Sequence, residues 1–505
     1  MMQTLWFSAV LALWLGVGPL VIAQPAGVGA IITVTTTADA LAADGLCSLR
    51  EAIVAANTDE AVAGCAAGSG ADTIVFSPYL PGPGILALII PGADEDAGLT
   101  GDLDIMGTLT INGAGQDKTI VDGNGIDRVF HVLPGAHATL SGMTIRNGDP
   151  GADGGGIKVL GSLTLINSSV DSNHGGGISN NGGGLVLSDV RVTNNTGGFG
   201  ISNQNLAVLN FNGGFVSGNQ GGGISNAASS ATLNNLHIAD NTSGGGVRNG
   251  GSTLTHLTLS NSTVTGNAAA SGGGILNAGV GAVFDIYNTS IAANTASGSG
   301  GGVFNNGMMT VSGSTLNRNQ ARSGGGIDHF GGHLTLTNDT LSGNAASDNG
   351  GGLYNRGPAI LTNVTLSGNT ANGPDTGGNI FNDTAQMALR NTIVANSEAD
   401  GNCFNSDGLV TSSGHNLDSG NTCGFGSPGD LTITDPLLGP LHDNGGPTLT
   451  HALLPGSPAI DHADHLQCPP VDQRGVSRPQ GSGCDIGAYE AAANTRYFYL
   501  PLLIR

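Results

Sequence analysis

The chain repeats a glycine-rich hexapeptide, which is clearest in Gly175-Gly-Gly-Ile-Ser-Asn180, Gly221-Gly-Gly-Ile-Ser-Asn226 and Gly244-Gly-Gly-Val-Arg-Asn249. Related hexapeptides follow one another at spacings of 21 to 28 residues, and they begin at Gly154, Gly175, Gly198, Gly221, Gly244, Gly272, Gly300, Gly324, Gly350 and Gly377. A period of about 20 to 50 residues is typical of solenoids, in which each unit packs only against its neighbours.

Each repeat has room for three short strands. One strand follows the glycines, a second alternates as in Leu163-Thr-Leu165, and a third has the form Val-x-x-Asn, as at residues 170–173. The density of glycine opposes a helix within the unit. We therefore predict an all-β fold, a right-handed single-stranded parallel β-helix whose coils have three strands each.

Stacking of coils explains which residue types recur. Successive coils of a parallel β-helix lie about 4.8 Å apart, so equivalent side chains stand directly above one another. The position after the glycines is always aliphatic, and we expect its side chains to point inward: Ile157, Ile178, Ile201, Ile224, Val247, Ile275, Val303, Ile327, Leu353 and Ile380.

Asparagine recurs at two further positions of the repeat. One column is Asn180, Asn203, Asn226, Asn249, Asn277, Asn305, Asn355 and Asn382, and the other runs from Asn173 to Asn369. Stacked amides hydrogen-bond along the axis, and asparagine accepts left-handed turns. Ligand binding is the alternative role. We favour structural ladders, because a binding site would be local whereas these residues recur in nearly every coil.

Composition excludes some functions. The net charge is −22, and Lys118 and Lys158 are the only lysines among 505 residues, so we expect no nucleic-acid partner. Glycine accounts for 87 residues, well above the average of about 7%.

The N-terminus has the form of an export signal. Residues 5–15 are apolar, and Val21-Ile22-Ala23 is typical of a cleavage site, although no basic residue precedes the apolar run. An uncleaved anchor is the alternative. We predict a signal peptide at residues 1–23, no transmembrane span after its removal, and an extracellular or cell-envelope location for a monomeric protein.

Six cysteines form three pairs that are local in sequence. In an exported chain they predict the disulfides Cys47–Cys65, Cys403–Cys423 and Cys468–Cys484, although six cysteines allow 15 pairings. A zinc site is the weaker alternative, because no CxxC motif is present. Near the first pair, Ser48 and Glu51 have capping-box spacing and predict a helix over residues 49–57 in an N-terminal cap.

The ends of the chain resemble bacterial exported proteins. Cys47-Ser-Leu-Arg-Glu-Ala-Ile53 resembles a CSLREA-type domain, and the segments 435–447, 456–461, 472–475 and 484–490 resemble a choice-of-anchor Q domain. The middle is similar to pectin-lyase-like β-helices and to polymorphic outer-membrane protein repeats, although aliphatic residues replace the phenylalanine of those repeats. The resemblance implies export and surface association.

The predicted organisation has five parts. They are the signal peptide, a CSLREA-type cap at 31–101, β-helix repeats at 102–399, a choice-of-anchor Q-type region at 400–490 and a tail at 491–505, in which 499–505 is a candidate anchoring signal.

Known enzymes with a similar fold cleave polysaccharides. They use carboxylates stacked on one face, either as acid and base or to bind Ca²⁺. We find no such stack, since Asp171, Asp189 and Asp240 occupy different repeat positions. The candidate catalytic residues are Asp328 and His329, where histidine interrupts an asparagine column; His333 and Asp339 are nearby in sequence.

Two binding sites are candidates. The position after the inward aliphatic column changes from polar residues to large apolar ones in the later coils, so Phe304, Tyr354 and Phe381 form a candidate platform for sugars or a protein partner. The alternative is that the C-terminal segment or a long loop covers these residues, since the later repeats have longer spacings and so longer loops. Asp122, Asn124 and Asp127 form a candidate Ca²⁺ loop, with a simple turn as the alternative.

The sequence favours a secreted or cell-surface, non-catalytic β-helix that acts in adhesion, in the envelope or as a scaffold for a glycan or a cell-surface protein. A polysaccharide lyase or glycoside hydrolase on the same fold is the alternative. We expect no cofactor, with Ca²⁺ as the exception to test.

Overall fold

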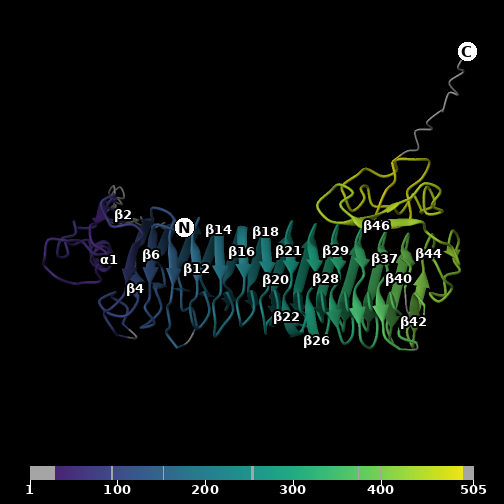
Figure 1. The fold of residues 1–505 in the computed structure, drawn as a ribbon, viewed down its shortest axis with the longest axis horizontal. Helices are drawn as coiled ribbons and strands as arrows, with labels where there is room; N and C mark the ends of the chain where they lie inside the picture. Colours follow the sequence, from purple (N-terminus) through teal and green to yellow (C-terminus); the bar gives the residue numbers. More distant parts are fainter. Residues whose placement is uncertain are drawn as a thin grey trace, which may run out of the picture.

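The computed structural model shows a right-handed parallel β-helix with a module on one side of its C-terminal end (Figure 1), which confirms the predicted fold class. It describes residues 29–92, 95–151, 153–251, 255–373, 375–397 and 401–492. The predicted signal peptide at 1–23 and the candidate anchoring signal at 499–505 lie outside these residues.

Three strand rows run along the axis. A 27-stranded sheet contains two of them, because three ten-residue strands span both: β14 Gly184–Thr193, β16 Val208–Ser217 and β18 Ser230–Ala239. The remaining strands of the first row are β1 Ile31–Val34, β2 Ala71–Phe76, β5 Thr108–Asn112, β8 His137–Ser141, β11 Ser162–Ile166, β20 His256–Ser260, β24 Val283–Tyr287, β28 Met308–Ser312, β32 His333–Thr337, β36 Ala359–Thr362, β40 Gln386–Arg390 and β43 Leu409–Ser412.

The second row and the third row complete each coil. The second row adds β3 Gly84–Ala87, β6 Thr119–Asp122, β9 Thr144–Arg146, β12 Ser169–Asp171, β21 Thr263–Thr265, β25 Ser290–Ala292, β29 Thr315–Asn317, β33 Thr340–Ser342, β37 Thr365–Ser367, β41 Ile393–Ala395, β44 Leu417–Asp418 and β45 Leu431–Thr432. The third row is a 13-stranded sheet of β4 Leu103–Ile105, β7 Phe130–Val132, β10 Ile157–Val159, β13 Ile178–Asn181, β15 Ile201–Gln204, β17 Ile224–Ala227, β19 Val247–Gly250, β23 Ile275–Asn277, β27 Val303–Asn305, β31 Ile327–His329, β35 Leu353–Asn355, β39 Ile380–Asn382 and β42 Cys403–Asn405.

Two small sheets remain. In the later coils, a five-stranded sheet forms from β22 Ala268–Ser271, β26 Thr295–Ser299, β30 Gln320–Ala321, β34 Ala345–Ala346 and β38 Thr370–Ala371. An antiparallel pair in the C-terminal region consists of β46 Leu438–His442 and β47 Thr450–Leu453.

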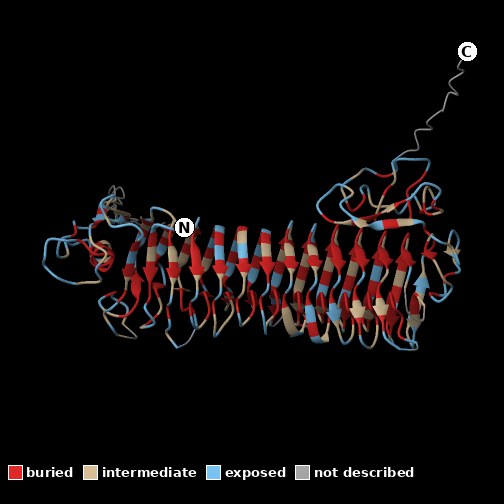
Figure 2. Ribbon diagram, in the orientation of Figure 1, coloured by how far each residue is buried: buried red, intermediate tan, exposed pale blue. Residues whose placement is uncertain are grey.

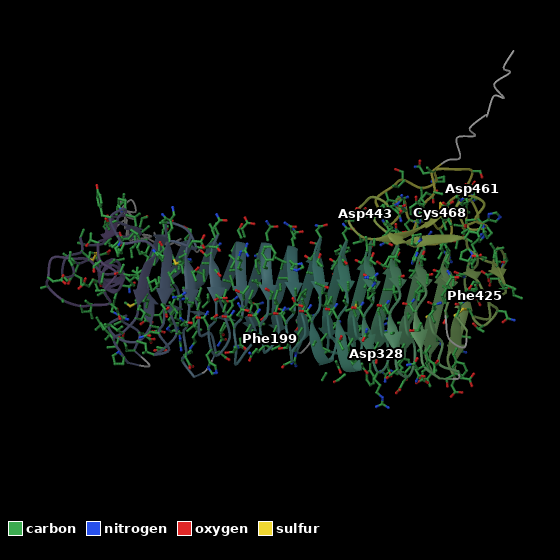
Figure 3. All side chains as sticks on the ribbon, viewed as in Figure 1. Phe199, Asp328, Phe425, Asp443, Asp461 and Cys468 are labelled. Carbon is green, nitrogen blue, oxygen red and sulfur yellow. A yellow bond between two sulfur atoms is a disulfide. The ribbon has the colours of Figure 1, made fainter. Side chains whose placement is uncertain are left out.

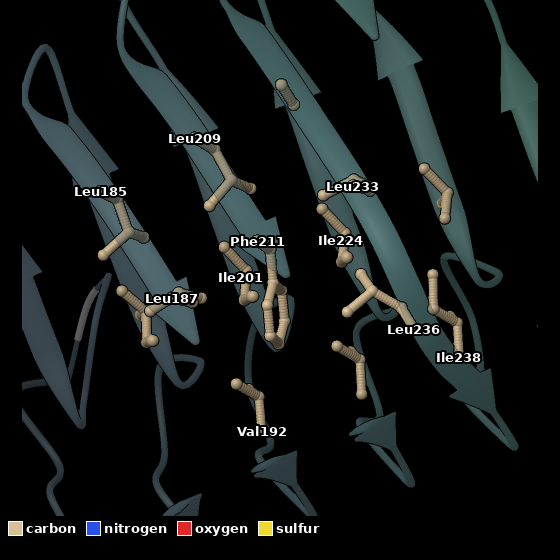
Figure 4. Packing of buried hydrophobic residues seen from close by; sticks show 14 of the residues in the cluster. Leu185, Leu187, Val192, Ile201, Leu209, Phe211, Ile224, Leu233, Leu236 and Ile238 are labelled. Atoms are coloured by element: carbon tan, nitrogen blue, oxygen red, sulfur yellow. The ribbon is translucent and has the colours of Figure 1, made fainter. Parts of the chain in front are cut away.

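The core is a set of vertical aliphatic columns. The residues after the glycines pair one above another, for example Ile178 with Ile201 and Ile201 with Ile224, and every member from Ile157 to Ile380 is at most 1% exposed. Residues of the first row such as Leu209 and Phe211 face them across the interior (Figure 4). Burial alternates with exposure along the strands (Figure 2), as expected for strands with one face in a core.

Both predicted asparagine ladders are present. The amide Nδ2 of Asn180, Asn203, Asn226, Asn249 and Asn277 each donates to the Oδ1 of the next member at 2.8 to 3.0 Å. In the ladder from Asn173 to Asn369, each Oδ1 beyond the first coil also accepts from the backbone N–H of the preceding asparagine. These amides are fully buried, and the stack satisfies most of their polar atoms; the Oδ1 atoms of Asn180 and Asn355, each at the start of an unbroken run, have no partner.

An N-terminal cap closes one end of the solenoid. Its helix α1, Leu49–Thr58, has Ser48 as N-cap with the predicted capping box to Glu51. Arg50 on this helix is buried, and it forms a bidentate ion pair with Asp39. The same guanidinium donates to the carbonyls of residues 98, 101 and 102, so it fixes the loop that leads into β4.

The three predicted disulfides are present as Cys47–Cys65, Cys403–Cys423 and Cys468–Cys484. The first lies in the cap, the second pins the last strand of the third row, and the third lies in the C-terminal region.

The C-terminal region packs on the second row, over strands β29 to β41. Gln473 bonds Thr315 and Thr340 on adjacent coils, and the backbone N–H of Ala488 donates to Thr365. Within this region Arg478 forms a fully buried ion pair with Glu490 at 2.8 Å. Within the described part of the chain, no helix is long and apolar enough to cross a lipid bilayer.

The buried ladder provides a test of what holds the coils together. Asn241→Ala removes the acceptor for two donors of Asn219 and leaves the Val216 carbonyl without its partner. We expect a loss of about 2–5 kcal/mol in the free energy of unfolding, measured by urea denaturation. Asn210→Ala, at an exposed position of β16, is the control and should change it by less than about 0.5 kcal/mol. Equal effects of the two substitutions would contradict a stabilising role for the ladder.

Candidate functional site

The outer face of the 13-stranded sheet carries a column in which side-chain chemistry changes along the axis. We call it the outer column, and it consists of Asp104, His131, Lys158, Ser179, Ser202, Ser225, Arg248, Leu276, Phe304, Asp328, Tyr354, Phe381 and Phe404. In Figure 3, Asp328 lies on the side of the solenoid away from Asp443, Asp461 and Cys468 of the C-terminal region. The C-terminal region therefore leaves this face open.

The N-terminal end of the outer column forms a pocket of about 190 Å³ rich in carboxylates. Its lining consists of Glu95, Asp96, Asp102, Asp127, Arg128, His131, Pro150 and Lys158, and we call it the acidic pocket. Asp104 lies beside it, paired in register with His131 on the next coil.

The cap positions the loop of this pocket. Arg50 holds the carbonyls of Gly98, Gly101 and Asp102, and Asn57 on α1 donates to the Asp104 carbonyl at 2.8 Å. Gly98 has a left-handed φ of +72°, and from this conformation its N–H donates to the Asp104 carboxylate at 2.9 Å. Two distant segments of sequence thus meet at one site.

Burial perturbs the carboxylates of the pocket. It raises the pKa of Asp102 to about 8, with neighbouring Asp104 adding to the shift and Arg128, at 3.2 Å, opposing it. Burial also raises the pKa of Asp104, whose carboxylate lies 3.1 Å from Nδ1 of His131. Raised carboxylate pKa values of this kind are common at functional sites, where acids and bases need tuned pKa values, and they also occur in structural ion-pair networks.

The C-terminal end of the outer column forms an aromatic–arginine stack, which consists of Phe304, Phe330, Arg356, Tyr354, Phe381 and Phe404. The Arg356 guanidinium lies 4.5 Å from the ring centroids of both Phe330 and Tyr354. The ring centroids of Phe304 and Phe330 are 6.1 Å apart, and Phe381 lies 5.2 Å from Tyr354 and 5.3 Å from Phe404. The stack therefore runs over successive coils of the sheet.

The predicted platform residues all belong to this stack, but they differ in exposure. Phe304 and Tyr354 are half-buried, whereas Phe381 is only 8% exposed. Phe330, which the sequence did not single out, is 49% exposed and directly follows β31. Exposed aromatic surface therefore comes both from the outer column and from the loop residue that follows strand β31 of that column.

The candidate catalytic pair Asp328 and His329 is fully buried. Asp328 accepts from Arg356 at 2.6 Å. Nδ1 of His329 lies 3.0 Å from the Asn305 amide, and Nε2 lies 3.1 Å from the Pro358 carbonyl, so the imidazole replaces an asparagine in the ladder. Burial lowers the pKa of His329 to about 4, which keeps the ring neutral at physiological pH.

Asp339 and His333 do not extend this pair. His333 is exposed on the first row, while Asp339 is buried and accepts from the backbone N–H groups of Ser314 and Thr337. Burial raises the pKa of Asp339 to about 8. Its position is held by serine or threonine in neighbouring coils, and the hydroxyls of Ser262 and Ser314 accept a similar bond from a backbone N–H group.

The candidate Ca²⁺ loop separates into two environments. Asp122 accepts from Arg146 at 2.8 Å and from Asn147, so an arginine already neutralises it. Asn124 has a left-handed φ of 52° in an exposed turn, and Asp127 lines the acidic pocket instead. The structure therefore brings Asp127 together with Asp102 rather than with Asp122.

The acidic pocket was missed from sequence because its strands lack the glycine motif. A signal was present nonetheless: Leu103-Asp-Ile105 and Phe130-His-Val132 place a polar residue between two apolar ones, as Ile157-Lys-Val159 does. Extension of the outer column by two coils would have brought Asp104 and His131 together. Asp96 and Asp102 come from an irregular loop, whose path no repeat predicts.

No protein-family model matches the chain, and a comparison with curated proteins gives no match. The resemblance of its ends to CSLREA-type and choice-of-anchor Q domains therefore stays a prediction. Among solved structures, the crystal structure of pectate lyase Pel9A is similar, with 15% sequence identity and a TM-score of 0.33 over 91% of this chain and 96% of that chain.

The environment of His329 makes a prediction that separates structure from catalysis. His329 has no bond to Asn355, whose Oδ1 is buried without a partner, whereas an asparagine would continue the ladder to it. We expect His329→Asn to change the free energy of unfolding by less than about 1 kcal/mol. His329→Leu removes two hydrogen bonds, to the Asn305 amide and to the Pro358 carbonyl, although each group keeps another partner, and it should lower the free energy by about 1–3 kcal/mol. Urea denaturation at pH 7 measures both, and a larger loss for His329→Asn than for His329→Leu would contradict the ladder role.

Proposed function

We propose that the protein is an exported, non-catalytic binding protein that holds a neutral glycan along its aromatic–arginine stack. The observation that carries the proposal is the exposure of this stack. Phe330 is 49% exposed on a face that the C-terminal region leaves open, and Phe304, Tyr354 and Phe404 are half-buried around it.

The chemistry of the stack suits a sugar polymer. Aromatic rings combine large apolar area with few rotatable bonds, and such exposed patches mark binding sites. The stack repeats with the coil spacing of about 4.8 Å, so it offers equivalent contacts to a polymer of regular units. Arg356 is paired with Asp328, and the net charge of −22 disfavours anionic polymers, so we infer a neutral glycan.

The titratable groups around the stack support binding without catalysis. Asp328 is buried against Arg356, and Asp383 accepts a hydrogen bond from the Tyr354 hydroxyl at 3.2 Å. Neither carboxylate is paired with a second acid or base that faces solvent, as hydrolysis of a glycosidic bond requires.

Glycan-array binding followed by calorimetry tests the proposal. We expect a neutral oligosaccharide to bind and Phe330→Ala to weaken it at least about tenfold. Phe215→Ala is the matched control, because Phe215 is 41% exposed and lies 4.8 Å from Arg191, but on the second row. Binding that is equally weakened by both substitutions, binding of a protein only, or no glycan binding would each contradict the proposal.

A polysaccharide lyase or hydrolase is the second candidate, and the acidic pocket favours it. Buried carboxylates there lie beside Lys158 and Arg128, the residue types that such reactions use as acid and base. Under the first proposal we expect no cleavage of pectate, alginate or neutral glycans with or without Ca²⁺. Cleavage that is lost in Lys158→Ala but kept in Lys118→Ala would establish the second candidate instead.

A further inference from the structure

We propose that Asp96, Asp104 and His131 bind a transition-metal ion of the Zn²⁺ or Mn²⁺ class at the edge of the acidic pocket. One ligand atom from each residue lies within 4.8 Å of the others. The proposal is independent of glycan binding, which concerns the opposite end of the outer column.

The spacing of the ligand atoms suits a small ion. Nδ1 of His131 lies 3.1 Å from a carboxylate oxygen of Asp104 and 3.6 Å from one of Asp96. Bonds of about 2.0–2.2 Å in tetrahedral geometry place neighbouring ligand atoms roughly 3.3–3.6 Å apart. His131 is at this spacing from both carboxylates, whereas the two carboxylate oxygens lie within 4.8 Å of each other, so the exposed side chain of Asp96 moves toward Asp104 when the three share one ion, with water at the remaining positions.

An ordinary histidine–aspartate hydrogen bond explains less of this arrangement. Nδ1 carries at most one proton, yet two carboxylates face it, and 3.6 Å is too long for a hydrogen bond. The imidazole side chain is only 7% exposed, and its Nε2 is buried without a hydrogen-bond partner. Nδ1 is the nitrogen that faces the two carboxylates, so an ion held there would not change the surroundings of Nε2, and the observation that supports the ion is the pair of carboxylates at Nδ1.

Charge in the pocket also favours a cation. Arg128 lies against Asp102, at 3.2 Å, whereas the side-chain contacts of Asp104 are His131 and the N–H of Gly98. A bound ion would supply the positive charge that this buried carboxylate lacks.

The backbone holds two of the ligands in place, and the third leaves access to solvent. Asp104 and His131 face each other in register on β4 and β7, and Asn57 anchors the Asp104 backbone. Asp96 is on the loop, with its side chain 71% exposed. Mixed nitrogen and oxygen donors suit Zn²⁺ or Mn²⁺, whereas Ca²⁺ prefers oxygen donors alone.

Isothermal titration of the untagged, chelator-treated full chain with ZnCl₂, MnCl₂ and CaCl₂ tests the site. We expect one equivalent of Zn²⁺ or Mn²⁺ to bind more tightly than Ca²⁺. Asp96→Asn should weaken that binding at least tenfold; because this side chain is exposed, the variant should keep the thermal stability of the metal-free wild type. His131→Gln should weaken it further. The control is His174→Gln, at an exposed histidine 2.9 Å from Asp149 alone, and it should leave binding unchanged.

Co²⁺ provides a second readout, because the intensity of its visible absorption depends on the number and geometry of its ligands. We expect a spectrum that saturates at one equivalent in the wild type and is absent in Asp96→Asn. No saturable binding, tighter binding of Ca²⁺ than of Zn²⁺ and Mn²⁺, or an equal loss in His174→Gln would overturn the proposal.

Discussion

In-register stacking of coils about 4.8 Å apart decides which side chains each position of the solenoid can hold. Once each residue stands over its equivalent, a polar group in the interior is tolerated only if its neighbours in the column can bond it. Asparagine meets this condition because its amide both donates and accepts, and the ladder from Asn173 uses both functions in each coil. Aliphatic side chains meet the same condition because they have no polar atoms that need a hydrogen bond. The glycines allow the backbone to turn sharply between these columns.

The same constraint explains how the solenoid accommodates His329 and Asp339, which differ from the other residues of their columns. His329 is accommodated because its two ring nitrogens replace the acceptor and donor of an asparagine, although the Oδ1 of Asn355 on the next coil is left without a donor. Asp339 is accommodated because two backbone N–H groups reach its carboxylate, and its raised pKa reflects the burial of the charge. A residue that departs from a stacked column must therefore replace the hydrogen bonds of the residue type that the column otherwise holds. Chemistry at such positions would require that the side chain also reach solvent, and neither of these two does.

The sequence predicted those features that repeat. Strand order, the inward aliphatic columns, the ladders and the capping box at Ser48 follow from periodicity or from local spacing, and the structure confirms them. The local disulfide pairs were also correct. The acidic pocket did not follow, because Asp96 and Asp102 belong to a non-repeating loop and because Arg50, more than 40 residues earlier, shapes that loop through carbonyl contacts. Phe330 was missed for a related reason. It directly follows β31, where residues no longer stack in register from coil to coil.

Arg50 connects the N-terminal cap to the outer column, and this contact gives the Cys47–Ile53 motif of the cap a physical role. A buried guanidinium needs acceptors on all sides, and here Asp39 and three loop carbonyls supply them. Lysine could not replace it, because a single ammonium cannot reach a carboxylate and carbonyls on two sides in the same plane. The cap thereby closes the apolar end of the solenoid and, with the same side chain, sets the path of the loop that brings Asp96 and Asp102 to His131. Architecture and candidate chemistry therefore meet at Arg50. In the middle coils of the outer column, by contrast, the small residues Ser179, Ser202 and Ser225 contribute little besides the stacking of one coil on the next.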